Sequence, residues 1–209
     1  MDKKFVIFDM DGTLVDSMIY WKNLATEFLN SKGISQVSKD ILEKIKPMTM
    51  TESAALFIRE FSLEGTPESI AAEMNQRMDE HYCKDIPLKE GVRSYLEQLA
   101  QKEIVMCVAS ATAEHLMEAC LTRLGVRSCF KFLLSCETVG TGKNQPDVYF
   151  EAAKRLGCLP CEAAVYEDAL YAAKTAKEAG FYVVGIYDES ADAHWNEMQN
   201  LADETIRTF

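Results

Sequence analysis

The stretch Phe5-Val6-Ile7-Phe8-Asp9-Met10-Asp11-Gly12-Thr13-Leu14-Val15-Asp16 decides the fold of this chain of 209 residues. Its four leading apolar residues indicate a short strand that is buried on both faces, as in a parallel sheet. Two carboxylates, Asp9 and Asp11, follow with one residue between them, and Gly12 comes directly after. Alternate residues of an extended segment project to the same side. Both acids would therefore overhang the crevice at the carboxyl end of the sheet, where open parallel sheets bind ligands.

The composition is that of a globular protein and argues against several kinds of partner. Hydrophobic residues make up 48% and charged residues 26% of the sequence, which is ordinary for a soluble domain. The net charge of −11 argues against nucleic acid and anionic membranes, because both bind basic surfaces. No apolar run approaches the roughly 20 residues of a membrane span. Asp9 and Asp11 interrupt the apolar run near the N-terminus, so we do not expect it to be the core of a signal peptide. Seven cysteines without framework spacing fit reduced thiols in a cytoplasm.

The segment after Asp16 has helical periodicity. Apolar residues recur at intervals of three and four, and Gly33 and Thr66-Pro67 are typical helix boundaries. The predicted helices are 17–32, 38–45, 51–62 and 67–83. We therefore expect residues 16–86 to form a small all-helical domain inserted into the chain. The side chains expected to pack this insertion, or in one case to line a substrate pocket, include Met18, Trp21 and Phe28.

From residue 87 onward, apolar strands alternate with amphipathic helices. The predicted strands are 104–109, 130–134, 163–166 and 181–186, and the predicted helices are 92–101, 113–124, 147–156, 169–179 and 192–200. Strands that alternate with helices of this length indicate a parallel sheet covered on both faces. The expected fold is an α/β, doubly wound, Rossmann-like core of residues 1–15 and 87–209, interrupted by the helical insertion.

The later strands also end in polar residues, and these would meet at the same edge of the sheet. Ser110 and Thr112, with Ala111 between them, follow the second strand; Lys143 lies in the flexible loop beyond the third, and Glu167 and Asp168 follow the fourth. Carboxylates crowded around one crevice repel one another unless a divalent cation joins them, and their hard oxygen atoms favour Mg²⁺. Lys143 and Ser110 then remain to hold phosphate oxygens. This set suits phosphoryl transfer, in which a carboxylate can itself be the nucleophile.

The stretch from Asp9 to Asp16 resembles the first motif of the haloacid dehalogenase-like phosphatase superfamily. Ser110, Lys143 and Glu167-Asp168 stand where its other three motifs are expected, in order and at suitable spacing. The resemblance spans the whole chain. The helical insertion resembles the cap of the subgroup that contains phosphoglycolate phosphatase and beta-phosphoglucomutase.

This resemblance implies a division of roles among the strand-end residues. Asp9 would attack phosphorus, and Asp11 would protonate the leaving alcohol and then deprotonate the water that hydrolyses the aspartyl phosphate. Mg²⁺ would be held by Asp9, the backbone carbonyl of Asp11 and Asp168, with Glu167 in support. The substrate would contact Gly12, Ser110, Ala111 and Lys143, of which Ser110 and Lys143 would also take part in catalysis.

The core departs from the family pattern after three of its motifs. The positions concerned are Asn144 in Lys143-Asn-Gln-Pro146, where the family usually has Pro, Ala169 and Ala172 after the acidic pair, and Glu114 after the serine. None of these changes removes an expected ligand, so we expect altered loops and retained activity. For Glu114 two outcomes stay open: a weakened phosphate site, or a carboxylate that merely faces solvent.

The helical insertion departs further from the mutase pattern. Trp21 and Met50 stand where beta-phosphoglucomutase has a His and an Arg, and a mutase holds its second phosphate with that Arg. This difference favours hydrolysis over mutase chemistry, although Lys22 or Lys46 remain candidates for the same task.

We expect a Mg²⁺-dependent phosphatase that acts on a small phosphorylated metabolite, with neither nucleic acid nor membrane as a partner and with a monomer favoured over an oligomer. A sugar phosphomutase is the neighbouring alternative. An alternative of another class is a phospho-accepting or phosphate-binding regulator, because receiver-type domains also combine an acidic Mg²⁺ pocket with a hydroxyl and a lysine. Asp11 discriminates between the classes, since a receiver needs no general acid on that strand.

Overall fold

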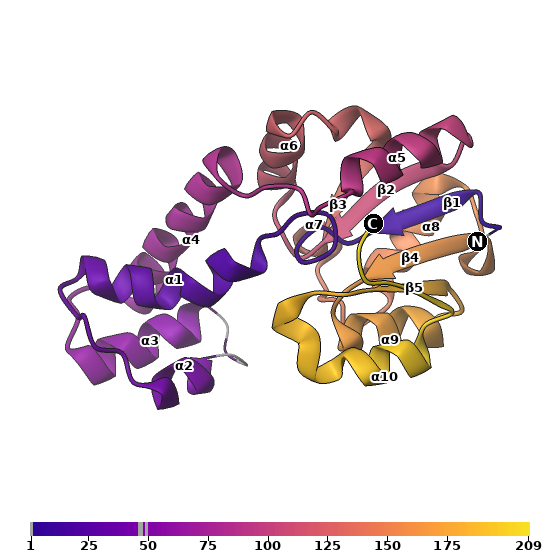
Figure 1. The fold of residues 1–209 in the computed structure, drawn as a ribbon. Helices are drawn as coiled ribbons and strands as arrows, with labels where there is room; N and C mark the ends of the chain where they lie inside the picture. Colours follow the sequence, from indigo (N-terminus) through magenta and orange to yellow (C-terminus); the bar gives the residue numbers. More distant parts are fainter. Residues whose placement is uncertain (1, 46–47, 49) are drawn as a thin grey trace. The chain divides into compact units, whose positions relative to one another are not determined.

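The computed structural model describes residues 2–45, 48 and 50–209. The chain divides into two compact units: Met1–Met18 together with Ile86–Phe209, termed the core unit, and Ile19–Asp85, termed the helical unit. Figure 1 shows a sheet with its covering helices in the core unit and a group of helices in the helical unit.

The core unit is built on a parallel sheet with the N-terminal strand at its centre. The strands are β1 (Phe5–Phe8), β2 (Val105–Ser110), β3 (Phe130–Ser135), β4 (Ala163–Glu167), β5 (Tyr182–Ile186) and β6 (Glu204–Ile206), in the order β3-β2-β1-β4-β5-β6. Phe8 is in register with Val108 on one side and with Tyr166 on the other. The residues that follow these three strands therefore emerge together at one edge, where a doubly wound sheet binds ligands.

Helices cover both faces of this sheet. They are α5 (Val92–Gln101), α6 (Glu114–Arg123), α7 (Cys136–Val139), α8 (Asp147–Leu156), α9 (Leu170–Glu178) and α10 (Trp195–Leu201). Short 3₁₀ turns lie at η1 (Arg127–Cys129), η2 (Pro160–Glu162) and η3 (Glu189–His194). Helices α8, α9 and α10 share one hydrophobic cluster with the sheet, and Figure 1 shows α5 and α6 on the opposite side. The predicted α/β, Rossmann-like fold is confirmed.

Strand β6 and helix α7 were not predicted, and one predicted helix needs correction. Strand β6 was not expected, because its three residues are too short to show a period and it pairs only at the edge, with Val184 beside Glu204. Helix α7 is also too short to predict from periodicity. The helix expected at 192–200 is two elements: Asp188 caps η3 by accepting from the Ser190 N–H, and α10 begins only at Trp195.

The helical unit owes its order to apolar packing. Its helices are α1 (Met18–Ser31), whose first residue belongs to the core unit, α2 (Lys39–Ile45), α3 (Met50–Phe61) and α4 (Pro67–Lys84), close to the predicted bounds. Phe28 and Phe57 are fully buried, and their rings stack with centroids 6.3 Å apart. Thr66 caps α4 through a reciprocal hydrogen-bond pair with Ser69, which satisfies amides that the helix leaves open.

Within the described part of the chain, no helix combines the length and the apolar character needed to cross a membrane. Lys46, one of the two lysines that are candidates for holding a second phosphate, lies outside the described residues.

Candidate active site

The loop after β1 turns sharply and places its residues against the neighbouring strand ends. The Asp9 N–H donates to the Tyr166 carbonyl over 2.9 Å, and the Leu14 N–H donates back to the Met10 carbonyl over 2.8 Å. Gly12 has φ +79°, and a Cβ there would lie 2.8 Å from the Asp168 Cγ. Both the left-handed backbone and the close approach of Asp168 require glycine at this position.

Beside this loop lies a buried cluster of carboxylates. Asp9, Glu167 and Asp168 each offer an oxygen atom within 4.8 Å of the others. The Lys143 ammonium donates to Asp9 and, over 2.5 Å, to Glu167. Tyr149 donates its hydroxyl to the same Glu167 oxygen over 2.9 Å. The structure thus brings together four of the predicted site residues: Asp9, Lys143, Glu167 and Asp168. The most distant pair in the sequence, Asp9 and Asp168, is 159 positions apart.

The cluster holds an excess of negative charge out of water. Burial raises the pKa of Asp9 well above its ordinary value; Lys143 opposes the shift, while Glu167, Asp168 and Asp11 add to it. Burial, Glu167 and Asp188 together raise the pKa of Asp168 to about 7. Burial lowers the pKa of Lys143, but Asp9 and Glu167 outweigh this and hold it well above the ordinary value. One lysine therefore does not compensate the carboxylates around it.

Asp11 is held apart from this cluster by two hydroxyl groups. Ser17 donates to Asp11 Oδ1 over 2.6 Å, and Thr112 donates to Asp11 Oδ2 over 2.5 Å. Both donors are buried. The Asp11 carboxylate is thereby fixed in orientation, which suits a group that must meet a proton at a defined place. Sequence reasoning did not single out Ser17, because a hydroxyl six residues after an acid has no local signature.

The serine motif lies at the carboxyl end of β2, next to β1. Ser110 is the last residue of that strand and is almost fully buried. Its hydroxyl oxygen accepts the Thr112 N–H over 3.1 Å, which shapes the turn into α6, whereas Ala111 is exposed. The contacts of Ser110, Ala111 and Gly12 with a substrate stay predictions.

A lysine that the sequence did not single out braces the same loop from another side. Lys89 donates through Nζ to the Gly12 carbonyl over 2.8 Å, to the Tyr187 carbonyl over 3.1 Å and to the Asp188 carboxylate over 2.5 Å. Its N–H also donates to the Leu14 carbonyl. Lys89 therefore joins the loop after β1 to the loop after β5, across separations that leave no trace in local sequence.

The structure explains two of the departures from the family pattern. Glu114 accepts from the Thr138 hydroxyl over 2.8 Å and from the Ser135 N–H over 3.3 Å, so its carboxylate supports the start of α7. Ala169 occupies the N-cap of α9 without a side-chain hydrogen bond, and Ala172 is fully buried. These residues alter how the loops are held.

The apolar candidates of the first helix have different environments. Phe28 is packed inside the helical unit, and the half-buried Trp21 donates its indole N–H to the Tyr82 hydroxyl over 3.1 Å. Met18 instead lines a cavity of the core unit together with Asp168. Packing is thus the observed role of Phe28 and Trp21, whereas Met18 shares a cavity with one residue of the acidic cluster.

The acidic cluster fits a divalent metal ion. Its donors are hard carboxylate oxygens, they are buried, and they lie close enough to share one ion. Burial and the neighbouring carboxylates raise the pKa of Asp9 and of Asp168, and a cation among them would favour their ionised forms. The Asp11 carboxylate is not in this cluster, and its expected contribution through the backbone carbonyl stays a prediction.

A parallel α/β core with an acidic centre at the carboxyl edge of its sheet defines the class of protein. The family model described as "Haloacid dehalogenase-like hydrolase" matches residues 6–186, and the chain belongs to this family.

Individual relatives agree with this assignment. The chain is 25% identical over 175 residues to the "Phosphorylated carbohydrates phosphatase" of Thermotoga maritima, covering 84% of this chain and 81% of that one. It is 27% identical over 194 residues to the "Beta-phosphoglucomutase" of Bacillus subtilis, covering 88% and 83%. Among solved structures, a "putative beta-phosphoglucomutase from Thermotoga maritima" superposes with a TM-score of 0.81 at 23% identity, covering 98% and 94%. That structural likeness shows the fold.

Proposed function

We propose that this protein is a Mg²⁺-dependent phosphatase that hydrolyses a small phosphomonoester through an aspartyl phosphate on Asp9. The observation that carries the proposal is the contrast between two neighbouring carboxylates. Asp9 lies inside the buried cluster with Lys143, Glu167 and Asp168, whereas Asp11 is oriented by two hydroxyl donors. The names of curated relatives, among them the phosphatase of Thermotoga maritima, support this assignment.

The proposed reaction has two steps. An Asp9 oxygen forms a bond to phosphorus while the bond from phosphorus to the ester oxygen breaks, and Asp11 gives its proton to the departing alkoxide. In the second step Asp11 takes a proton from water as the water oxygen attacks the same phosphorus, which releases inorganic phosphate and restores Asp9. Lys143 neutralises charge on the phosphoryl oxygens and on Asp9 throughout.

The residues that would hold Mg²⁺ are Asp9, Asp168 and the Asp11 carbonyl, with Glu167 in support. A cation bound there would compensate the buried carboxylates and favour the ionised form of Asp9, which is the nucleophilic form. Glu167 is positioned by Tyr149 and Lys143 at the base of the cluster.

A phosphomutase remains the second candidate because a beta-phosphoglucomutase is among the relatives. A mutase has to return the phosphoryl group to a sugar phosphate, and so has to hold a second phosphate. At the two positions that depart from the mutase pattern, Trp21 is engaged with Tyr82 and residue 50 is Met50, which carries no charge. Hydrolysis is therefore the better supported reaction. A cytoplasmic location, a monomeric state and a small metabolite as partner remain predictions from the sequence.

Release of inorganic phosphate from a panel of sugar phosphates, phosphoglycolate and nucleotides tests the proposal. We expect turnover with Mg²⁺ and its loss on chelation. Asp9→Asn should reduce kcat by at least about 10³-fold, as for loss of a nucleophile. Turnover by Asp9→Asn equal to that of the wild type would contradict the proposal, and interconversion of sugar phosphates without net phosphate release would favour the mutase.

A further inference from the structure

A second feature of the core unit lies beside the acidic cluster and has no role in the two proposed steps. It is a cavity of about 370 Å³ between the first turns of α9 and the segment of η3. Asp168 forms part of its wall, and so do Met18, Leu170, Tyr171 and Ala191. All of the residues that line the cavity belong to the core unit.

The position of the cavity links it to the reacting groups. Asp168 belongs both to the cavity wall and to the cluster in which its oxygen lies within 4.8 Å of an Asp9 oxygen. Met18 follows Ser17, whose hydroxyl holds the Asp11 carboxylate. The cavity is thus bounded by Asp168, which lies beside the phosphoryl-accepting group, and by Met18, the sequence neighbour of a residue that holds the proposed proton donor. A phosphoryl group on Asp9 would therefore lie next to Asp168, a lining residue of this cavity.

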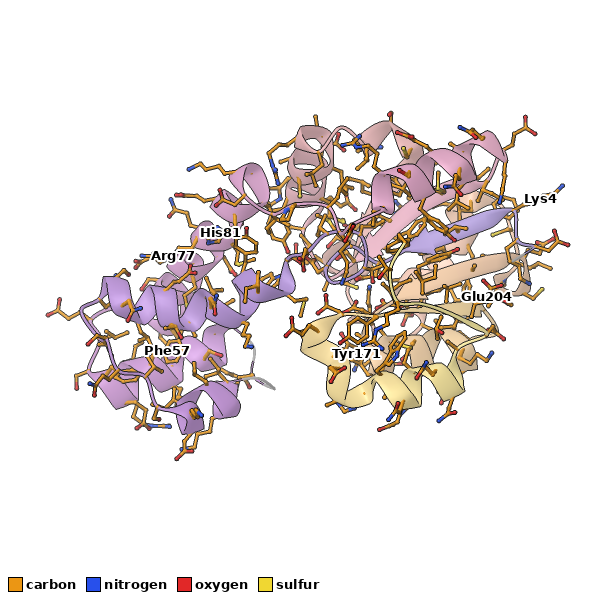
Figure 2. The ribbon with its side chains drawn as sticks, viewed as in Figure 1. Lys4, Phe57, Arg77, His81, Tyr171 and Glu204 are labelled. Carbon is orange, nitrogen blue, oxygen red and sulfur yellow. The ribbon has the colours of Figure 1, made fainter. Side chains whose placement is uncertain are left out.

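The side chains that line the cavity restrict which alcohol part of a phosphomonoester would fit there. Met18, Leu170 and Ala191 are apolar, and Tyr171, labelled in Figure 2, is 59% exposed although its ring lines the cavity. An aromatic ring left open beside an apolar cavity offers a face for stacking, and aromatic pairs of this kind are favourable beyond the area they bury.

The rim does not favour a second anionic group. Lys174 lines the cavity, but its Nζ lies 3.4 Å from the Glu197 carboxylate. The charge of Lys174 is therefore shared with an acid already in place. A bisphosphate, whose far end is an anion, gains little at this rim.

From these observations we infer that the cavity is a leaving-group subsite, and that it selects phosphomonoesters whose alcohol part is uncharged and has a flat apolar face. Tyr171 is the specificity residue, and Met18 and Leu170 contribute further apolar lining. The inference rests on the proposed phosphatase function and names the substrate class for the same site.

The test compares two alkyl phosphates that differ in the alcohol: 2-phenylethyl phosphate and glycerol 3-phosphate. In the full-length protein with Mg²⁺, Tyr171→Ala should lower kcat/KM for 2-phenylethyl phosphate about fivefold to tenfold, mainly through KM, which is the range of one aromatic contact. For glycerol 3-phosphate the decrease should be less than about twofold. Tyr171→Phe keeps the ring and should retain most of the wild-type preference.

Phe150→Ala is the matched control, because Phe150 is another exposed aromatic of the core unit, 44% exposed on α8 and outside this cavity. It should change neither substrate. An equal loss for both substrates in Tyr171→Ala, or no loss for either, would overturn the subsite.

A binding measurement separates this inference from the proposed function. The Kd of 3-phenylpropylphosphonate, which cannot be hydrolysed at its P–C bond, should rise about fivefold or more in Tyr171→Ala, while the Kd of inorganic phosphate should stay within about twofold. Absence of phosphate release from every ester in the wild type would refute the phosphatase. An unchanged phosphonate Kd in Tyr171→Ala would refute the subsite whether or not the protein hydrolyses esters.

Discussion

The core unit and the helical unit bury different kinds of side chain. The buried polar and charged residues of the core unit include Asp9, Lys143, Glu167, Asp168 and Asp188. Among the described residues of the helical unit, no charged side chain is buried, and the interior is formed by residues such as Phe28 and Phe57. The two units therefore differ in where their charged side chains lie: the core unit buries several of them, and the helical unit keeps its described ones at its surface.

This difference indicates that the core unit carries the catalytic groups, whereas apolar packing holds the helical unit together. A buried charge costs free energy unless partners compensate it, and several together at one sheet edge are a poor way to gain stability. The helical unit keeps its ion pairs at the surface: Lys32 and Glu73 are 2.7 Å apart with 35% and 38% of their side chains exposed. A pair of that kind contributes about 0–1 kcal/mol. We therefore expect substitutions in the core cluster to change activity most and substitutions in the helical interior to change stability most.

Among substitutions that leave the nucleophile in place, Asp11→Asn should give the largest effect. The amide keeps the size of the side chain and can neither give nor take the proton, so kcat should fall by about 10²-fold to 10⁴-fold with the thermal midpoint nearly unchanged. Steady-state kinetics and thermal unfolding on one preparation make the measurement. Asp16→Asn is the matched control, since Asp16 is an exposed acid of the same loop. Equal activity in Asp11→Asn and Asp16→Asn would remove the proposed proton donor.

Phe57→Ala tests the other side of the comparison. Phe57 is fully buried between aromatic neighbours in the helical unit, so its truncation should lower the free energy of unfolding by about 3–5 kcal/mol through lost burial and a cavity. Urea unfolding followed by circular dichroism measures this. Leu63→Ala, on the more exposed connection before α4, should cost much less. A loss below about 1 kcal/mol in Phe57→Ala would show that the helical unit is not held by its apolar interior.

Lys89→Met should have an intermediate effect on both stability and activity. The substitution leaves the Gly12 and Tyr187 carbonyls and the Asp188 carboxylate without their shared donor, at a cost of about 1–3 kcal/mol. Adding Asp188→Asn should recover part of that loss, because the stranded negative charge is then removed. Strictly additive losses in the double variant would show that the two residues act independently.

The smallest effect is a dependence of stability on acidic pH. Burial alone would raise the pKa of Asp188, but hydrogen bonds from Lys89 and Ser190 outweigh it and hold the pKa below the ordinary value. An acid whose pKa is lowered by folding contributes stability above its unfolded pKa of about 4, and that contribution is lost as the pH falls through the folded pKa. Unfolding free energies of the wild type should therefore drop more steeply below about pH 4 than those of Asp188→Asn. Identical slopes would contradict the role of this pair.

The sequence was most informative at the ends of the strands. The acids at the end of β1, the serine at the end of β2 and the acidic pair at the end of β4 could be assigned because a parallel sheet brings its strand ends together. Ser17, Tyr149 and Lys89 were missed because each acts through a partner that is distant in sequence or without a spacing rule. Strand β6 was missed because three edge residues show no period. The gathering of Asp9, Glu167 and Asp168 follows from the topology, whereas the orientation of Asp11 requires coordinates.

The most direct test of the proposed chemistry is the identity of the phosphorylated residue. Asp11→Asn should slow hydrolysis of the aspartyl phosphate, so this variant is mixed with substrate and Mg²⁺, quenched in acid and reduced with borohydride, and its peptides are analysed by mass spectrometry. We expect the modified position to be Asp9, and no modification when Asp9→Asn is added. Label on any other residue, or full phosphate release by the Asp9→Asn protein, would contradict nucleophilic attack by Asp9.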